Sequence, residues 1–294
     1  MTLTARRGGR ASVGTSLRPS TDTRTDVELL APSQDDLHRW RSAVSPEHPR
    51  HPLRSADAAA VWNGVVWGRL GRCDLAWAWW DSVDEPTLQP WIAGERGRIL
   101  RELGLHEQAA EVEEEGLTTA RDVVDVVLLR LSLAADAVGM GREAAARRAL
   151  GTAGSLLDEL PDDERVCRQR LRRRWIEVEI ALLTGSRPED EGLPTMGDDG
   201  PLFPDDHAAG TDFHRAKGLL FAGVARGDDR LLEAAAGLAP PMLRWAVELA
   251  RADRGDEEAR RRATTAWRKV VPPDHVADEV AATPTAQRLE ALRR

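Results

Sequence analysis

The chain of 294 residues contains no tyrosine, two lysines (Lys217 and Lys269) and two cysteines. Arginine and tryptophan are plentiful beside these deficits, which is typical of GC-rich coding, so arginine content alone is not evidence of function. Cys73 and Cys167 are far apart, and neither stands in a CxxC or Cys/His spacing. This pattern predicts a reducing compartment and no zinc site.

Long apolar segments and an excess of positive charge are also missing. No apolar run approaches the roughly 18–20 residues that a membrane span needs. The pair Arg6 and Arg7 is followed by no hydrophobic segment, which argues against an export signal. A net charge of −8 and a pI of about 5.5 argue against a general nucleic-acid binder. We therefore expect a cytoplasmic protein without membrane contact.

The common catalytic motifs are absent as well. The sequence has no GxxxxGK[ST] loop, no GxGxxG turn and no GxSxG elbow. His48 and His51 lie three apart between prolines without further ligands beside them, which disfavours a metal site there. The least poor acid/base or metal candidate is an acidic cluster in a loop: Asp205, Asp206, His207, Asp212 and His214. We expect no enzyme, no metal and no cofactor.

A repeat is the main feature that is present. Gly64 and Gly97 are 33 residues apart, and the same offset relates Trp67 to Leu100, Gly71 to Gly104 and Ala76 to Ala109. A looser third copy follows 37 residues later, with Ala134, Ala137, Gly141, Ala146 and Leu150. A period near 34 with two amphipathic helices per unit predicts stacked helical hairpins, in which the small Ala76 and Ala109 pack against Gly64 and Gly97.

With these residues the chain resembles the tetratricopeptide-repeat (TPR) family. The first copy fits the family pattern of small, large, turn glycine, alanine and bulky residue, the last being Trp80. The second copy departs at the bulky position, where Glu113 stands. The resemblance implies an all-α fold of stacked antiparallel hairpins, a TPR-like α-solenoid, that binds a partner peptide in a concave groove.

Composition divides the chain into four parts. Residues 1–30 are expected to form a disordered basic tail, and 31–185 the TPR-like repeats, with three helix pairs over 56–160. An acidic, proline-rich loop or linker covers 186–211, where we expect no packed element. Degenerate repeats and a capping helix occupy 212–294. The apolar helix over 123–139 is expected to be the most buried.

Candidate binding residues lie on the first helix of each hairpin, which by the resemblance lines the concave face. Their spacing relative to the core glycines places them on the exposed side: Arg69, Trp91, Arg98 and Arg101. Arginine binds carboxylates and tryptophan offers a rigid apolar platform, so an acidic peptide would fit. The alternative is that Arg98 and Arg101 are ordinary solvated residues.

A second basic cluster lies on the helix predicted after Pro161. Arg165, Arg168 and Arg172 flank its apolar stripe. They could bind an acidic peptide or a phosphate, but arginines along a buried stripe commonly keep their heads in water, and we favour that interpretation.

The leading functional hypothesis is a protein–protein interaction scaffold or adaptor that binds an acidic protein or peptide. The alternative is a helical sensor or regulatory module of a signalling or transcriptional regulator.

Overall fold

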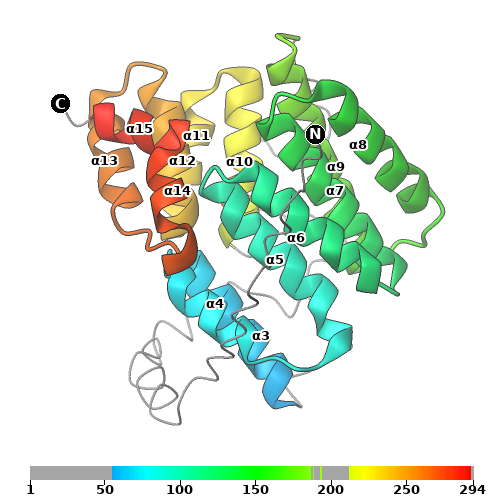
Figure 1. Cartoon of the computed structure of the whole chain (residues 1–294). Coiled ribbons are helices and arrows are strands. Elements are labelled where there is room, and N and C mark those ends of the chain that lie inside the picture. Colours follow the sequence, from blue (N-terminus) through cyan, green and yellow to red (C-terminus); the bar gives the residue numbers. More distant parts are fainter. Residues whose placement is uncertain (1–54, 187, 189–192, 194–211, 293–294) are drawn as a thin grey trace, which may run out of the picture.

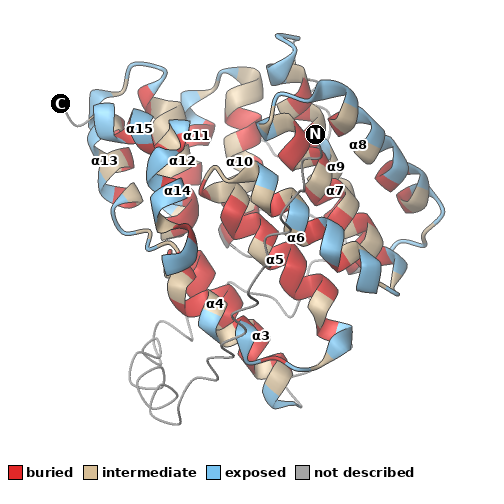
Figure 2. Cartoon of the chain, in the orientation of Figure 1, coloured by how far each residue is buried: buried red, intermediate tan, exposed pale blue. Residues whose placement is uncertain are grey.

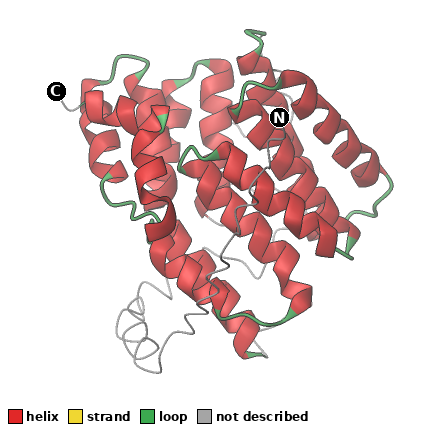
Figure 3. Ribbon diagram, viewed as in Figure 1, coloured by secondary structure: helices red, strands yellow, loops and turns green. Residues whose placement is uncertain are grey.

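The computed structural model describes residues 55–186, 188, 193 and 212–292. All regular structure in these residues is helical, apart from one isolated bridge between Arg72 and Val271 (Figure 3). The prediction of an all-α protein is confirmed. The predicted tail over 1–30 and most of the acidic segment 186–211 lie outside the described residues.

Three helix pairs fill residues 56–158, as predicted. They are α3 (Ala56–Arg69) with α4 (Cys73–Asp81), α5 (Gln89–Glu102) with α6 (His106–Thr119), and α7 (Val123–Gly139) with α8 (Glu143–Asp158). The long α9 (Glu164–Leu183) follows alone. The remaining helices are α10 (Asp212–Arg226), α11 (Asp229–Leu238), α12 (Pro241–Ala252), α13 (Glu257–Trp267), α14 (Ala277–Ala282) and α15 (Pro284–Ala291), with short 3-10 helices at Pro86–Leu88 and Asp274–Val276.

Glycine ends the first helix of each of these pairs. Gly71, Gly104 and Gly141 have φ angles of 83°, 86° and 69°, in the left-handed region that only glycine enters without strain. This conformation reverses the chain within about two residues, so the second helix packs back on the first. The repeat placed all three turns correctly.

The packing inside the first two pairs differs from the expectation. Ala76 was expected to face Gly64, but a Cβ atom on Gly64 would lie 2.2 Å from Nε1 of Trp80. In the second pair a Cβ atom on Gly97 would lie 2.0 Å from Oε1 of Glu113. The glycines therefore make room for the large residue at the end of the pattern rather than for the alanine.

The helices that face the interior form a closed ring. Contacts run in order through α3, α5, α7, α9, α10 and α12, and α12 contacts α3 again. The closure is reinforced where the Cys73 amide donates to the Val271 carbonyl at 3.0 Å and the Val271 amide donates to Gly71 at 2.7 Å. Figure 1 shows the segment between α13 and α14 meeting the pair of α3 and α4. The two ends of the helical array thus share one core.

The most buried helix is α5, not α7 as the sequence predicted. Ten of the 14 residues of α5 are buried, against nine of the 17 of α7 (Figure 2). The reason is position: α5 packs on α3, α4, α6 and α7 at once. The burial of α5 is not visible in the sequence, because a hydrophobicity pattern predicts charged residues to be exposed and α5 carries charged residues that are buried.

One residue of the acidic segment is described and buried. Leu193 is 5% exposed and packs in a core cluster with Trp175 of α9 and Phe221 of α10. This side chain belongs to the core, and the prediction that the segment holds no packed element concerns residues that mostly lie outside the described part of the chain. Among the described helices, none is long and apolar enough to cross a membrane.

Candidate functional site

A cavity of about 90 Å³ lies inside the ring, between α5, α7, α9 and α10. We call it the inner pocket. Its lining is formed by Trp91, Gly94, Glu95, Arg98, Arg101, Val124, Asp125, Leu128, Leu131, Ser132, Ala135, Arg165, Arg168, Gln169, Arg172, Trp175, Ile176, Glu179, Phe213, His214, Lys217 and Phe221.

The structure brings the two predicted clusters to this one place. From the predicted peptide-binding set Trp91, Arg98 and Arg101 line the inner pocket, and so do all three residues of the basic cluster: Arg165, Arg168 and Arg172. Arg69 lies beside it, with its guanidinium carbon 3.4 Å from the centre of the Phe213 ring. In the sequence the two clusters are separate predictions, because no local pattern shows that α5 and α9 face each other.

The expected exposure of the α3 and α5 residues is wrong. Arg69 is 3% exposed and Arg98 is 5% exposed. Arg98 donates to Glu95 at 2.8 Å and to Glu102 at 2.8 Å, and Arg69 approaches Glu95 at 3.9 Å. Closure of the ring buries the face that an open array would expose, and carboxylates of α5 compensate the buried charges.

Arg101 is the centre of a second buried cluster. It donates to Asp136 of α7 at 2.8 Å and to Glu113 of α6 at 2.5 Å, and both carboxylates are fully buried. Although burial opposes ionisation, Arg101 holds the pKa of Asp136 below its usual value. Burial raises the pKa of Glu113 well above its usual value. Glu113, the residue that breaks the repeat pattern, is therefore the buried partner of Arg101.

The basic cluster of α9 faces inward. Arg165 donates to Asp122 at 2.9 Å and to Asp125 at 3.1 Å, and Arg165 and Arg168 are both buried. The interpretation that their heads lie in water is wrong for these two. Arg172 is half-buried and lines the same cavity.

From the wall contributed by α10, only His214 was a candidate in the sequence, as part of the acidic cluster. Phe213, His214 and Lys217 reach the inner pocket from this helix, which follows the acidic segment in sequence. The ring of Trp175 stacks on His214 at 6.3 Å and on Phe221 at 5.9 Å between centroids. One available signal was the rarity of lysine, since Lys217 is one of two in the chain.

Two groups of the inner pocket have pKa values shifted toward neutrality. Burial lowers the pKa of Lys217 to about 8, and this shift is opposed by the carboxylates of Glu102 and Glu179. Burial also raises the pKa of Glu179. Shifts of this kind concentrate at binding and reaction sites, because such sites withdraw charged groups from water.

His214 predicts a dependence of stability on pH. Burial, followed by the charge of Arg168, lowers its pKa well below the usual value, so the native protein does not take up the proton that the unfolded chain binds below about pH 6.5. The contribution of neutral His214 to the free energy of unfolding is fully present above that pH and is lost as the pH falls. At pH 5 the loss should be about 2 kcal/mol relative to pH 8. Urea unfolding of wild type and His214→Phe at both pH values measures it.

Comparing the pH dependence of wild type with that of His214→Phe separates the effect of His214 from that of the carboxylates that titrate in the same range. His275→Phe is the control for replacing a histidine, because His275 is exposed and does not line the inner pocket. An equal pH dependence in wild type and His214→Phe would contradict a buried neutral imidazole.

Two buried polar atoms at the inner pocket lack partners. Oε1 of Gln169 and Nε1 of Trp175 have no hydrogen-bond partner within the described part of the chain. Gln169 is 6% exposed and Trp175 is 3% exposed. Because buried polar groups are nearly always hydrogen-bonded, a donor and an acceptor from a bound molecule would complete this wall.

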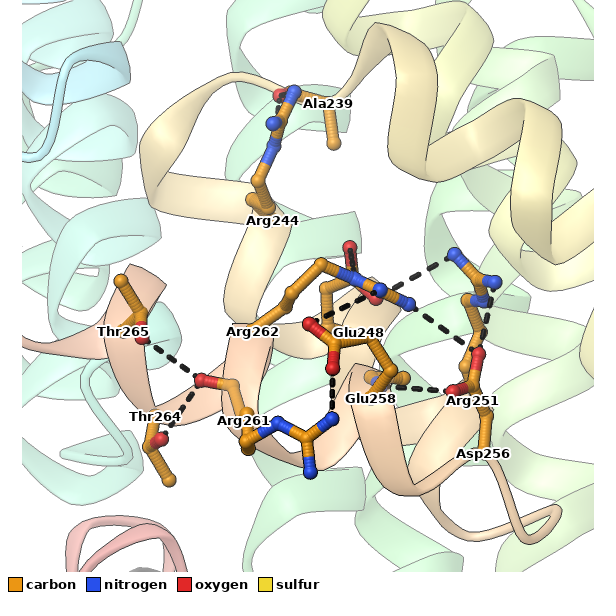
Figure 4. Close-up of polar contacts among 11 residues, drawn as sticks. Ala239, Arg244, Glu248, Arg251, Asp256, Glu258, Arg261, Arg262, Thr264 and Thr265 are labelled. Atoms are coloured by element: carbon orange, nitrogen blue, oxygen red, sulfur yellow. Dashed lines mark hydrogen bonds and ion pairs between the residues drawn. The ribbon is translucent and has the colours of Figure 1, made fainter.

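A second hollow lies on the outside of the ring, between the α11–α12 loop and α13. This outer groove has a volume of about 570 Å³. Figure 4 shows its side chains engaged with one another: Arg262 reaches Glu248 at 3.1 Å and Asp256 at 3.3 Å, and Arg244 donates to the Ala239 carbonyl at 3.0 Å. The charges here hold α12 to α13.

The described residues include no group of three or more histidine, cysteine, aspartate or glutamate side chains that could hold a metal ion. His214, the one described side chain of the acidic-cluster candidate, lines the inner pocket instead. Comparison with family models, with curated proteins and with solved structures found no match for this chain.

Proposed function

We propose that the chain is a ligand-binding module of TPR-like helical hairpins, in which the inner pocket holds a small anion with an apolar portion. Six cationic side chains line the inner pocket against three carboxylates. The cations are Arg98, Arg101, Arg165, Arg168, Arg172 and Lys217, and the carboxylates are Glu95, Asp125 and Glu179. Aromatic side chains from three helices supply the apolar part of the wall: Trp91, Trp175, Phe213 and Phe221.

The observation that carries this proposal is the pair of unpartnered buried atoms on Gln169 and Trp175. A carboxylate or phosphate oxygen accepts a hydrogen bond from the tryptophan N–H, and an amide or hydroxyl of the same ligand donates to the glutamine oxygen. Both atoms belong to α9, which also carries Arg168 and Arg172, so one ligand could engage the whole face of this helix.

The size of the inner pocket supports a small ligand. About 90 Å³ admits a few water molecules or a short organic acid, and it is well below the 300 Å³ or more of most drug-sized sites. An extended peptide does not fit inside it. The alternative of a sensor or regulatory module therefore agrees better with the geometry than the scaffold hypothesis.

The scaffold hypothesis remains a second proposal in a narrower form. A partner protein would insert one acidic side chain into the inner pocket, near Trp91 and Arg101, rather than lay a peptide along a groove. Arg98, Arg101 and Arg165 already bind internal carboxylates, so the inserted side chain would compete with these carboxylates for the guanidinium groups.

The test uses propionate as the anionic probe and propionamide as its neutral control. We expect propionate to raise the melting temperature in a saturable manner and to bind with measurable heat, whereas propionamide should do neither. Arg172→Gln should weaken propionate binding by a factor of about 10 to 150, since a charge-assisted hydrogen bond contributes about 1.5–3 kcal/mol. Calorimetric titration of both proteins measures this.

Arg174→Gln is the matched control, because Arg174 lies on the same helix, is exposed and does not line the inner pocket. It should bind propionate like wild type. Equal responses to propionate and propionamide, or equal losses in both variants, would contradict an anion site at this place.

A further inference from the structure

The amine of Lys217 lies in the inner pocket beside two aromatic rings. Its Nζ lies 5.6 Å from the centre of the Trp175 ring and 6.0 Å from that of Phe213. No hydrogen bond or ion pair joins this amine to another described residue, although several carboxylates are close by. The amine thus lies beside two aromatic rings and remains available to a ligand.

We propose that Lys217 is a nucleophilic amine that forms an imine with a small carboxylate ligand bearing an aldehyde or keto group. The inference rests on the proposed function, since the cations of the inner pocket are what would hold the carboxylate. The nitrogen of Lys217 attacks the carbonyl carbon and a C–N bond forms. The carbonyl oxygen leaves as water with the two amine hydrogens, so no oxidant or reductant takes part.

The surroundings favour the neutral amine that this attack requires. Charged and titratable groups face Lys217 from every wall: Glu95, Arg98, Arg101 and Glu102 on α5, Asp125 on α7, Arg165, Arg168, Arg172 and Glu179 on α9, and His214 on its own helix. Burial is the largest effect and lowers the pKa of Lys217 to about 8, while Arg101 and Arg172 act in the same direction. A lysine withdrawn from water beside other cations is a known way to activate an amine.

Lys269 provides a control within the same molecule. It is exposed at the rim of the outer groove, and it is the only other lysine. At pH 8 an amine of pKa about 8 is neutral in about half of the molecules, roughly a hundredfold more than an ordinary lysine side chain. Part of this advantage is lost because a less basic nucleophile is also weaker.

The experiment treats the full chain at pH 8 with glyoxylate and cyanoborohydride, which reduces an imine to a stable secondary amine. Peptide mapping by mass spectrometry then compares the rates of modification at the two lysines. We expect Lys217 to be modified about tenfold faster than Lys269. Propionate should slow the reaction at Lys217 and leave that at Lys269 unchanged.

Lys217→Arg keeps the charge and removes the nucleophile, so its adduct should disappear while the adduct at Lys269 persists. Equal rates at both lysines in wild type would overturn the inference without any variant. Binding of propionate without trapping at Lys217 would leave the anion pocket intact and remove the imine. Trapping at Lys217 that propionate does not slow would overturn the inference in this form, since the amine would act outside the anion site.

Discussion

Replacing Arg101 by methionine is expected to lower the free energy of unfolding by about 3–5 kcal/mol. The substitution keeps an apolar stem of similar length but leaves Glu113 and Asp136 buried without their cation. Both carboxylates are fully buried, so water cannot replace the guanidinium. Urea unfolding at pH 7, followed by circular dichroism, measures the change.

A second variant separates the cost of unpaired buried charge in Arg101→Met from the cost of lost side-chain packing. The triple variant Arg101→Met/Glu113→Gln/Asp136→Asn removes all three charges and should recover most of the lost stability, because an uncharged buried cluster carries no unpaired ion. Arg147→Met is the surface control: Arg147 pairs with Glu143 in the open, and its loss should cost less than about 1 kcal/mol. If the triple variant is no more stable than Arg101→Met, unpaired charge is not the cause.

The helical fold could be predicted because local rules determine it. The spacing of Gly71, Gly104 and Gly141 marks positions where the chain must adopt a positive φ, and that requirement is visible in sequence. The N-caps are local as well: the side chain of Asp256 accepts from the Ala259 amide at 2.9 Å, as expected for the start of α13. Such signals need no knowledge of distant contacts.

Ring closure could not be predicted because it depends on contacts between distant segments. The bridge between Arg72 and Val271 joins residues near opposite ends of the described chain. No periodicity in either segment predicts it. Closure also explains why exposure was misjudged. In an open array Arg69 and Arg98 would face solvent, whereas in the ring they face the interior and each approaches Glu95.

The candidate site was predicted in pieces rather than as a whole. Residue chemistry singled out the α5 set and the α9 set separately, and both line the inner pocket. The α10 wall was predicted only at His214, because no recognisable motif surrounds Phe213 and Lys217 in the segment TDFHRAKGLL. The buried carboxylates Glu113 and Asp136 were missed because a charged residue on a helix is normally read as exposed.

Gly64→Leu is expected to reduce the free energy of unfolding by about 3 kcal/mol or more, at the upper end of overpacking effects. Even a Cβ atom at this position would lie 2.2 Å from Nε1 of Trp80, so the indole must move. It has little freedom to do so, since Trp80 is 1% exposed and donates a hydrogen bond to the Val61 carbonyl at 3.2 Å. Gly64→Ala should already destabilise, despite the higher helix propensity of alanine.

Gly151→Ala is the control, and it should change the free energy of unfolding in the opposite direction. Gly151 lies within α8, and a Cβ atom there would meet nothing within 4 Å, so alanine should stabilise by up to about 1 kcal/mol. In a protein that carries Trp80→Leu, Gly64→Ala should lower the free energy of unfolding by less than it does in wild type, because the smaller leucine leaves space for the added methyl group. If Gly64→Ala stabilises as Gly151→Ala does, the close approach of α3 and α4 at Trp80 is refuted, and with it the packing rule that relates Gly64 to Gly97.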